Sequence, residues 1–214
     1  MKLPDIVPLF PLPNVVFFPR MPLPLHIFEP RYRTMVRDAV KGARLIGMVL
    51  LRGDRETDYA SPPEVFGVGT VGELVRMEEL PDGRFNIVLR GLREFVIHRE
   101  LSRAEYREGV VSWREPPSDT LPASTRAGVG AVVLQYLQRT GRAGSDSSLV
   151  ESGVDDETFV NFLAQHLDLD PLEKQALLEA GSLGERGRRL VDVLEFRLEE
   201  LRLDLGGQAV RRPH

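Results

Sequence analysis

The chain has 214 residues, 42% hydrophobic and 28% charged, which suits one or two globular domains with a well-formed core. The formal net charge of -4 excludes a strong overall attraction to nucleic acid or acidic lipid. The chain contains no cysteine, which excludes disulfides, thiolate metal sites and cysteine nucleophiles. Its apolar runs stay well short of the ~20 residues of a membrane-spanning helix, so we expect a cytoplasmic protein without membrane partners.

The N-terminal segment, residues 6–32, is both apolar and rich in proline. Each proline removes a backbone amide donor, which disfavours a helix or a central strand, while the apolar content excludes a free tail. We therefore expect short edge strands and turns packed onto other elements. The expected elements in chain order are strands at 6–10, 15–18 and 23–27, a helix that begins at Pro30 and ends before Gly42, and a buried strand at 45–51.

The next part of the chain has the pattern of β-strands. A polar stretch with two prolines at 53–65 predicts a mobile loop. Beyond it, two β-type runs between Phe66 and Ile97 flank Pro81-Asp82-Gly83, and this turn sequence predicts a hairpin. Gly91 interrupts the alternation of the second run and predicts a bulge or a barrel corner. One more strand is expected from 106 to 113.

After Pro116-Pro117 the pattern becomes helical. We expect helices at 122–139 and 155–167, a flexible stretch at 144–148, and a third helix opened by Asp170-Pro171 with a capping-box glutamate. A long last helix follows, with a nearly heptad-spaced leucine stripe. The order of strands and then helices predicts an α+β fold with a β unit at 1–114, a helical unit at 118–205 and a disordered tail at 206–214.

Three blocks of the sequence resemble one known family. They are Leu9-Phe10-Pro11-Leu12 through Phe28-Glu29-Pro30-Arg31-Tyr32, then Gly67-Val68-Gly69-Thr70-Val71 through Glu94-Phe95, then Glu173-Lys174-Gln175-Ala176-Leu177-Leu178-Glu179 with the leucine-rich last helix. In this order and spacing they resemble the N-terminal substrate-binding domain of Lon proteases over nearly the whole chain. The resemblance implies a PUA-like β-barrel followed by a four-helix bundle.

The resemblance also implies a function. In Lon this region engages unfolded or degron-bearing proteins and passes them to an ATPase. The present sequence has no Gly-x-x-x-x-Gly-Lys-Ser/Thr loop to hold phosphates and no peptidase module. We therefore expect a stand-alone recognition module that is not an enzyme and uses no cofactor. It would bind exposed apolar or extended segments of proteins and act with a separate ATP-dependent protease or chaperone.

Six apolar side chains near the proline-rich segment and the hairpin are candidates for peptide binding, because methionine and aromatic groups suit promiscuous contacts. They are Phe17, Phe18, Met21, Phe28, Tyr32 and Met77. The competing interpretation for each of them is a place in the hydrophobic core. Exposed strand edges near the prolines are a further candidate for accepting a client strand.

Two other functions, peptidase activity and RNA binding, compete with recognition. A stand-alone peptidase would need a nucleophile and a base, but the chain has only three lysines, Lys2, Lys41 and Lys174, and its four histidines show no metal-type spacing. RNA binding through a basic stretch that includes Arg90, Arg93, Arg99, Arg103 and Arg107 is opposed by interleaved glutamates that nearly cancel the charge. The Gly67–Gly72 run matches Gly-x-Gly-x-x-Gly, but it continues as a strand, which disfavours a dinucleotide site. We expect no catalytic residues and no metal site. The nearly heptad-spaced stripe of the last helix is compatible with a homo-oligomer.

Overall fold

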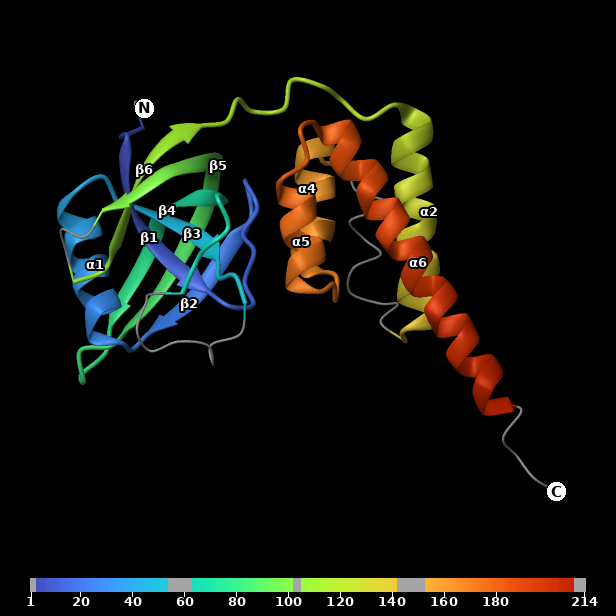
Figure 1. Ribbon diagram of the computed structural model, residues 1–214, viewed down its shortest axis with the longest axis horizontal. Coiled ribbons are helices and arrows are strands. Elements are labelled where there is room, and N and C mark those ends of the chain that lie inside the picture. Colours follow the sequence, from blue (N-terminus) through green and yellow to red (C-terminus); the bar gives the residue numbers. More distant parts are fainter. Residues whose placement is uncertain (1–2, 54–62, 102–104, 142–152, 210–214) are drawn as a thin grey trace. The chain divides into compact units, whose positions relative to one another are not determined.

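The computed structural model describes residues 3–53, 63–101, 105–141 and 153–209 (Figure 1). Most of the loop expected at 53–65 and all of the flexible stretch expected at 144–148 lie outside these ranges. The elements in chain order are β1 (Ile6–Leu12), β2 (Pro22–Ile27), α1 (Pro30–Lys41), β3 (Leu45–Leu50), β4 (Val68–Glu79), β5 (Phe85–Leu101), β6 (Arg107–Trp113), α2 (Ala123–Arg139), α4 (Asp156–His166), α5 (Pro171–Leu178) and α6 (Leu183–Ala209). The expected α+β class is confirmed.

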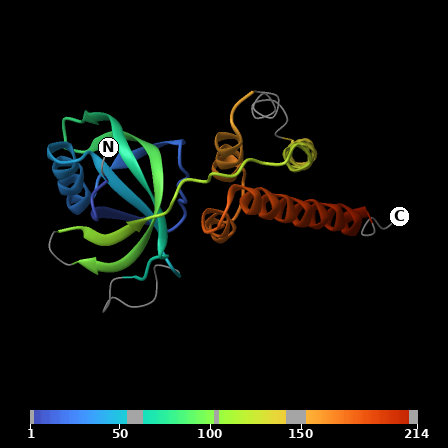
Figure 2. The same cartoon turned by 90° about the horizontal axis from the view of Figure 1, so that it is seen from above.

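The strands form one mixed sheet in the order β2-β5-β4-β3-β1-β6. Among the strands of the described residues, β1 and β3 pair in parallel and the other pairs are antiparallel. Because β6 pairs with β5 as well as with β1, the pairing from β5 through β4, β3, β1 and β6 returns to β5. Figure 2 shows the strong curvature that this circuit requires, with α1 beside the sheet.

Local sequence signals explain several of these elements. The expected turn at Pro81-Asp82-Gly83 joins β4 to β5, and Gly83 adopts a positive φ of 79° that a side chain would oppose. The register shifts where Gly72 pairs with Gly91, which confirms the irregularity expected there. A Cβ atom on Gly91 would overlap the carbonyl oxygen of Phe18, so glycine also permits a close approach of two chain segments.

The contacts divide the chain into two compact units, and this division differs from the one expected at 114–118. The first unit contains Met1–Pro116 together with Asn161–Glu179, and the second contains Pro117–Val160 together with Ala180–His214. The sequence assigned 161–179 to a four-helix bundle because it is helical. In the structure these residues cluster with the sheet, so the four-helix bundle is not confirmed.

Long-range hydrogen bonds show why Asn161–Glu179 belongs to the sheet unit. The buried Asn161 side chain donates to the Pro19 carbonyl at 3.2 Å. The Gln175 side chain donates to the Val68 carbonyl at 3.0 Å. Polar side chains of two successive helices, α4 and α5, thus satisfy backbone carbonyls of the sheet unit.

The core of the sheet unit contains the inward side chains of the strands. One cluster consists of Val7, Leu9, Leu45, Val49, Val71, Phe95 and Val111. The strand expected at 15–18 does not form, but Phe17 and Phe18 in this irregular segment are fully buried. Their apolar character reflects burial rather than strand pairing.

In the second unit α2 and α6 lie side by side (Figure 1). The predicted stripe on α6 packs inward at Gly187, Leu190 and Leu194, which are buried. At Gly187 an added Cβ would approach the Leu121 side chain to 3.1 Å, so the small residue lets the two segments meet closely. A disordered tail is expected from residue 206 onward, but α6 continues past Gly206-Gly207 to Ala209. Residues 210–214 lie outside the described chain.

Candidate peptide-binding site

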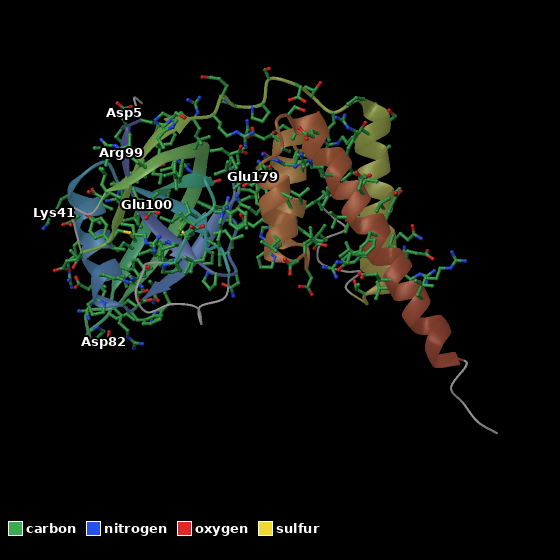
Figure 3. All side chains as sticks on the ribbon, viewed as in Figure 1. Asp5, Lys41, Asp82, Arg99, Glu100 and Glu179 are labelled. Carbon is green, nitrogen blue, oxygen red and sulfur yellow. The ribbon has the colours of Figure 1, made fainter. Side chains whose placement is uncertain are left out.

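A three-stranded part of the sheet unit offers a shallow groove. We call this three-stranded part the ribbon. It consists of β2, the Phe85–Arg90 start of β5 and the Val75–Glu79 end of β4, which pair antiparallel in the spatial order β2-β5-β4. Its tip is marked by Asp82 in Figure 3. The groove has a volume of about 420 Å³ and is lined by Pro24, Leu25, His26, Arg76, Glu78, Asn86, Ile87 and Val88.

Alternation along the strands places six of these side chains on one face, whereas Leu25 and Ile87, which pair with each other, belong to the opposite face. In β5, Phe85, Ile87 and Leu89 are buried, while Asn86 and Val88 between them are half-buried. Asn86 pairs with His26 on one side and with Glu78 on the other, so three polar groups from three strands form a row across the groove. Side chains of alternate residues face opposite ways, which is why the same strand supplies both core and groove.

Hydrogen bonds hold this polar row in place. The His26 Nδ1 atom lies 2.8 Å from Asn86 Oδ1, and Arg84 Nη1 lies 3.2 Å from His26 Nε2. The Arg84 guanidinium also pairs with Asp82 at 2.6 Å. The hydrogen bond from the Arg84 amide is the main reason that the pKa of Asp82 is lowered. The groove therefore presents oriented donors and acceptors beside the apolar surfaces of Pro24 and Val88.

The structure separates the six predicted peptide-binding residues into two groups. Four of them, Phe17, Phe18, Met21 and Tyr32, are buried, with exposed fractions of 1%, 0%, 3% and 5%. They are not accessible to a client in this conformation. Phe28 is 60% exposed and Met77 is 38% exposed. A binding role stays a prediction for these two accessible side chains.

Phe28 lies next to the groove. It follows β2 directly, and its ring stacks on the His26 ring with centroids 6.3 Å apart and planes inclined by 27°. Because His26 lines the groove, the exposed Phe28 ring extends the groove with an apolar surface. The sequence predicts Phe28 as a binding residue but does not predict Asn86, Arg76 or Glu78. The alternation in β5 was the signal that could have found Asn86.

A polar side chain of α4, Gln165, bonds to the backbone on both sides of the buried residue Met21. Gln165 accepts a hydrogen bond from the Phe18 amide at 3.1 Å and donates one to the Pro22 carbonyl at 2.9 Å. Its single amide group thus spans the segment that contains Met21. Arg114 fastens α5 in a similar way, because its guanidinium pairs with the buried Glu94 at 2.8 Å and donates to the Leu178 carbonyl at 2.9 Å.

Lys174 and His166, two of the candidates for a catalytic base, have structural contacts. Lys174 donates to the Gln165 carbonyl at 2.7 Å, and burial lowers the pKa of its amine. His166 stacks on Phe162 at 4.1 Å within α4. Lys2 and His214 lie outside the described residues. Within the described ranges, no cluster of three histidine or acidic side chains is arranged to hold a metal ion.

The glycine run and the arginines also have structural explanations. Gly69 and Gly72 lie within β4, and a Cβ atom on Gly69 would overlap the Met48 carbonyl, so the run permits close strand packing. Arg90 pairs with Glu73 at 2.6 Å and Arg107 with Glu100 at 3.2 Å. These ion pairs neutralise part of the basic stretch that RNA binding would use. Arg103 lies outside the described residues.

Comparisons with known proteins match this chain over most of its length. Residues 6–195 match the family model of the substrate-binding domain of ATP-dependent protease La (LON). The Lon protease of Flavobacterium johnsoniae is 25% identical over 207 residues, which cover 94% of this chain and 25% of that protein. The Lon protease of Geobacter metallireducens is 32% identical over 186 residues, which cover 84% of this chain and 22% of that protein. The chain thus spans about a quarter of the length of these relatives.

Solved structures show the same fold. A Lon N-terminal domain protein from Xanthomonas campestris superposes with a TM-score of 0.65 at 27% identity, covering 87% of this chain and 97% of that one. The N-terminal domain of Mycobacterium avium complex Lon protease superposes with a TM-score of 0.67 at 19% identity, covering 89% and 98%. Among the described residues, no helix has the length and apolar character needed to cross a membrane. By sequence and by fold, this chain belongs to the Lon substrate-binding domain family.

Proposed function

We propose that this chain is a non-enzymatic recognition module that binds exposed apolar or extended segments of protein substrates through the groove of the ribbon and the adjoining Phe28 ring. The observation that carries the proposal is an exposed aromatic ring stacked on a groove-lining histidine in a domain of the Lon substrate-binding family. An extended client can place apolar side chains against Phe28, Pro24 and Val88. Its backbone amides and carbonyls can bond to the row formed by His26, Asn86 and Glu78.

The chemistry of the groove supports weak and tolerant binding. A flat aromatic ring and a proline offer apolar area without a deep pocket that would select one side chain. The polar row carries both donors and acceptors, so it suits the backbone of any sequence more than a particular charged side chain. A dissociation constant in roughly the micromolar to high micromolar range is expected for such a shallow site.

The finer features implied by the family belong to the same proposal. The closed circuit of strand pairing supports a PUA-like barrel. Membership of the Lon family supports unfolded or degron-bearing proteins as clients and a separate ATP-dependent protease or chaperone as a partner. The cytoplasmic location expected from the sequence stays a prediction.

The test compares two phenylalanines of nearly equal exposure. Phe28 is 60% exposed beside the groove, and Phe196 is 62% exposed on α6. Binding to a permanently unfolded protein, such as reduced and carboxymethylated lactalbumin, is measured by fluorescence anisotropy, with the native protein as a second ligand. Phe28→Ser should weaken binding several-fold, while Phe196→Ser should leave it unchanged.

Three results would contradict the proposal. One is the absence of binding to the unfolded ligand at several hundred micromolar, roughly the weakest range such a site should show. Another is an equal loss of affinity in the two variants, because binding would then follow general hydrophobicity rather than the groove. Preferential binding of the native ligand would also contradict it.

A further inference from the structure

The ribbon has two long edges, and the edge of β2 is closed to further strands. The Gly91 amide donates to the Met21 carbonyl at 2.9 Å, so this carbonyl and the backbone groups of every second residue after Met21 are directed toward β5. Pro22 and Pro24 therefore face outward, and neither has an amide proton to donate. The outward carbonyl of Pro22 already accepts from Gln165. Prolines at such positions are a known protection of sheet edges against pairing.

The opposite edge, on β4, is open. β3 pairs with β4 only along Thr70–Glu73, whereas β4 continues to Glu79. All five residues of Val75–Glu79 are exposed. The Leu80 amide donates to the Arg84 carbonyl at 2.8 Å, so Leu80, Glu78 and Arg76 direct their backbone groups toward β5.

It follows that Met77 and Glu79 direct their amides and carbonyls away from the ribbon. Within the part of the chain that the structure describes, no backbone hydrogen bond reaches these groups from another strand. Unpaired donors and acceptors along an exposed strand are a template for another strand. Unlike β2, this edge has no proline.

The side chains of the open edge are complementary to themselves. Reading from Met77 in the two directions, the neighbours are Arg76 and Glu78, which carry opposite charges. In an antiparallel pair centred on Met77, each Arg76 lies directly opposite Glu78 of the other strand, on the same face of the sheet. Arg76 has no ion-pair partner among the described residues, and the only contact shown for the Glu78 carboxylate is a long 3.4 Å hydrogen bond from Asn86.

We propose that the Val75–Glu79 edge of β4 binds the same edge of a second copy of this chain, antiparallel and with Met77 opposite Met77 of the second copy. The two methionine residues exchange amide-to-carbonyl hydrogen bonds, and two Arg76–Glu78 pairs flank them. Glu79 keeps its own contact with Arg37 at 3.4 Å. The register shift between Leu74 and Arg76 makes the edge irregular at Val75, so the paired stretch is short and the dimer is weak and sensitive to salt.

Charge reversal tests both the surface and the register. Sedimentation equilibrium of the full chain, from low micromolar to about 1 mM, should show concentration-dependent dimers in dilute salt. Arg76→Glu and Glu78→Arg should each abolish dimers, because like charges then face each other. An equimolar mixture of the two variants should form a heterodimer, and the double variant R76E/E78R should again form a homodimer.

Two more variants keep the experiment decisive. Met77→Pro removes the outward amide and should give a monomer, with circular dichroism confirming that the fold persists. Phe196→Ser alters the exposed face of α6 and should leave the dimer intact. The proposal is overturned if the wild-type chain remains monomeric to about 1 mM. It is also overturned if the single variants still dimerise, if their mixture does not, or if only Phe196→Ser removes association.

Discussion

Replacing Gln165 by alanine tests how the α4 segment is held against the sheet unit. The Gln165 side chain makes two hydrogen bonds to the backbone, one from the Phe18 amide and one to the Pro22 carbonyl. The two hydrogen bonds contribute unequally to the free energy of unfolding. Phe18 is fully buried, so its amide loses its acceptor away from water, whereas Pro22 is exposed and its carbonyl can bind solvent instead.

The expected loss follows from that difference. An unsatisfied buried donor costs about 1–3 kcal/mol, while an exposed carbonyl that exchanges a protein donor for water costs close to nothing. The Gln165→Ala variant should therefore lose about 1–3 kcal/mol of unfolding free energy. Gln165→Glu keeps an acceptor for the Phe18 amide and should lose less than the alanine variant.

Chemical denaturation measures the loss of unfolding free energy for the whole chain. Hydrogen exchange measures the loss of protection at the Phe18 amide. Protection of that amide should fall by roughly fivefold to hundredfold, because each tenfold change corresponds to about 1.4 kcal/mol. His166→Ala is the control, since the exposed His166 ring contacts Phe162 within the same helix. If Gln165→Ala leaves the exchange of Phe18 unchanged, the hydrogen bond does not hold this segment and the reasoning is wrong.

Three further predictions follow from the same structure. Phe17→Ala, at a side chain with 1% exposure, should cost about 3–5 kcal/mol and lower the melting temperature, so an unchanged temperature would contradict its place in the core. Arg114→Ala leaves Glu94 buried without this ion-pair partner and should cost about 3 kcal/mol by denaturation, most of which should return when Glu94 is also replaced by leucine. Desolvation raises the pKa of Asp119, but hydrogen bonds from amides including that of Gly184 outweigh it, so the pKa is lowered from 3.8. Because a lowered folded-state pKa contributes its full stabilisation above the unfolded value, Asp119→Ala should cost about 0.5–2 kcal/mol at pH 7. The carboxylate accepts from the Leu183 and Gly184 amides at the start of α6, so the difference from wild type should shrink as the pH falls through the lowered pKa. A constant difference down to pH values of about 2 would refute this capping role.

The sequence determined those features that depend on neighbours along the chain. Pro30 begins α1 because the first turn of a helix does not use the amide proton that proline lacks. Gly42 is the C-cap residue at which the helix ends. Pro81-Asp82-Gly83 forms the hairpin turn because its residues match the required backbone angles. Asp170 and Glu173 form the predicted capping box, which satisfies the amides at the start of α5.

Only the tertiary structure decided which of the candidate side chains are accessible and where the helices belong. Phe17 and Phe28 have the same apolar side chain in the same proline-rich segment, yet one is buried and the other is exposed. Gln165 lies 147 positions from the Phe18 amide that it accepts from, and this contact helps to assign a helical segment to the sheet unit. Burial and strand pairing depend on residues that are distant along the chain, whereas turn angles and helix caps depend on adjacent ones. The same distinction applies to the two edges of the ribbon. The prolines of β2 indicate from the sequence alone that its edge cannot accept another strand, whereas the β4 edge is unpaired because β3 ends its pairing at Glu73.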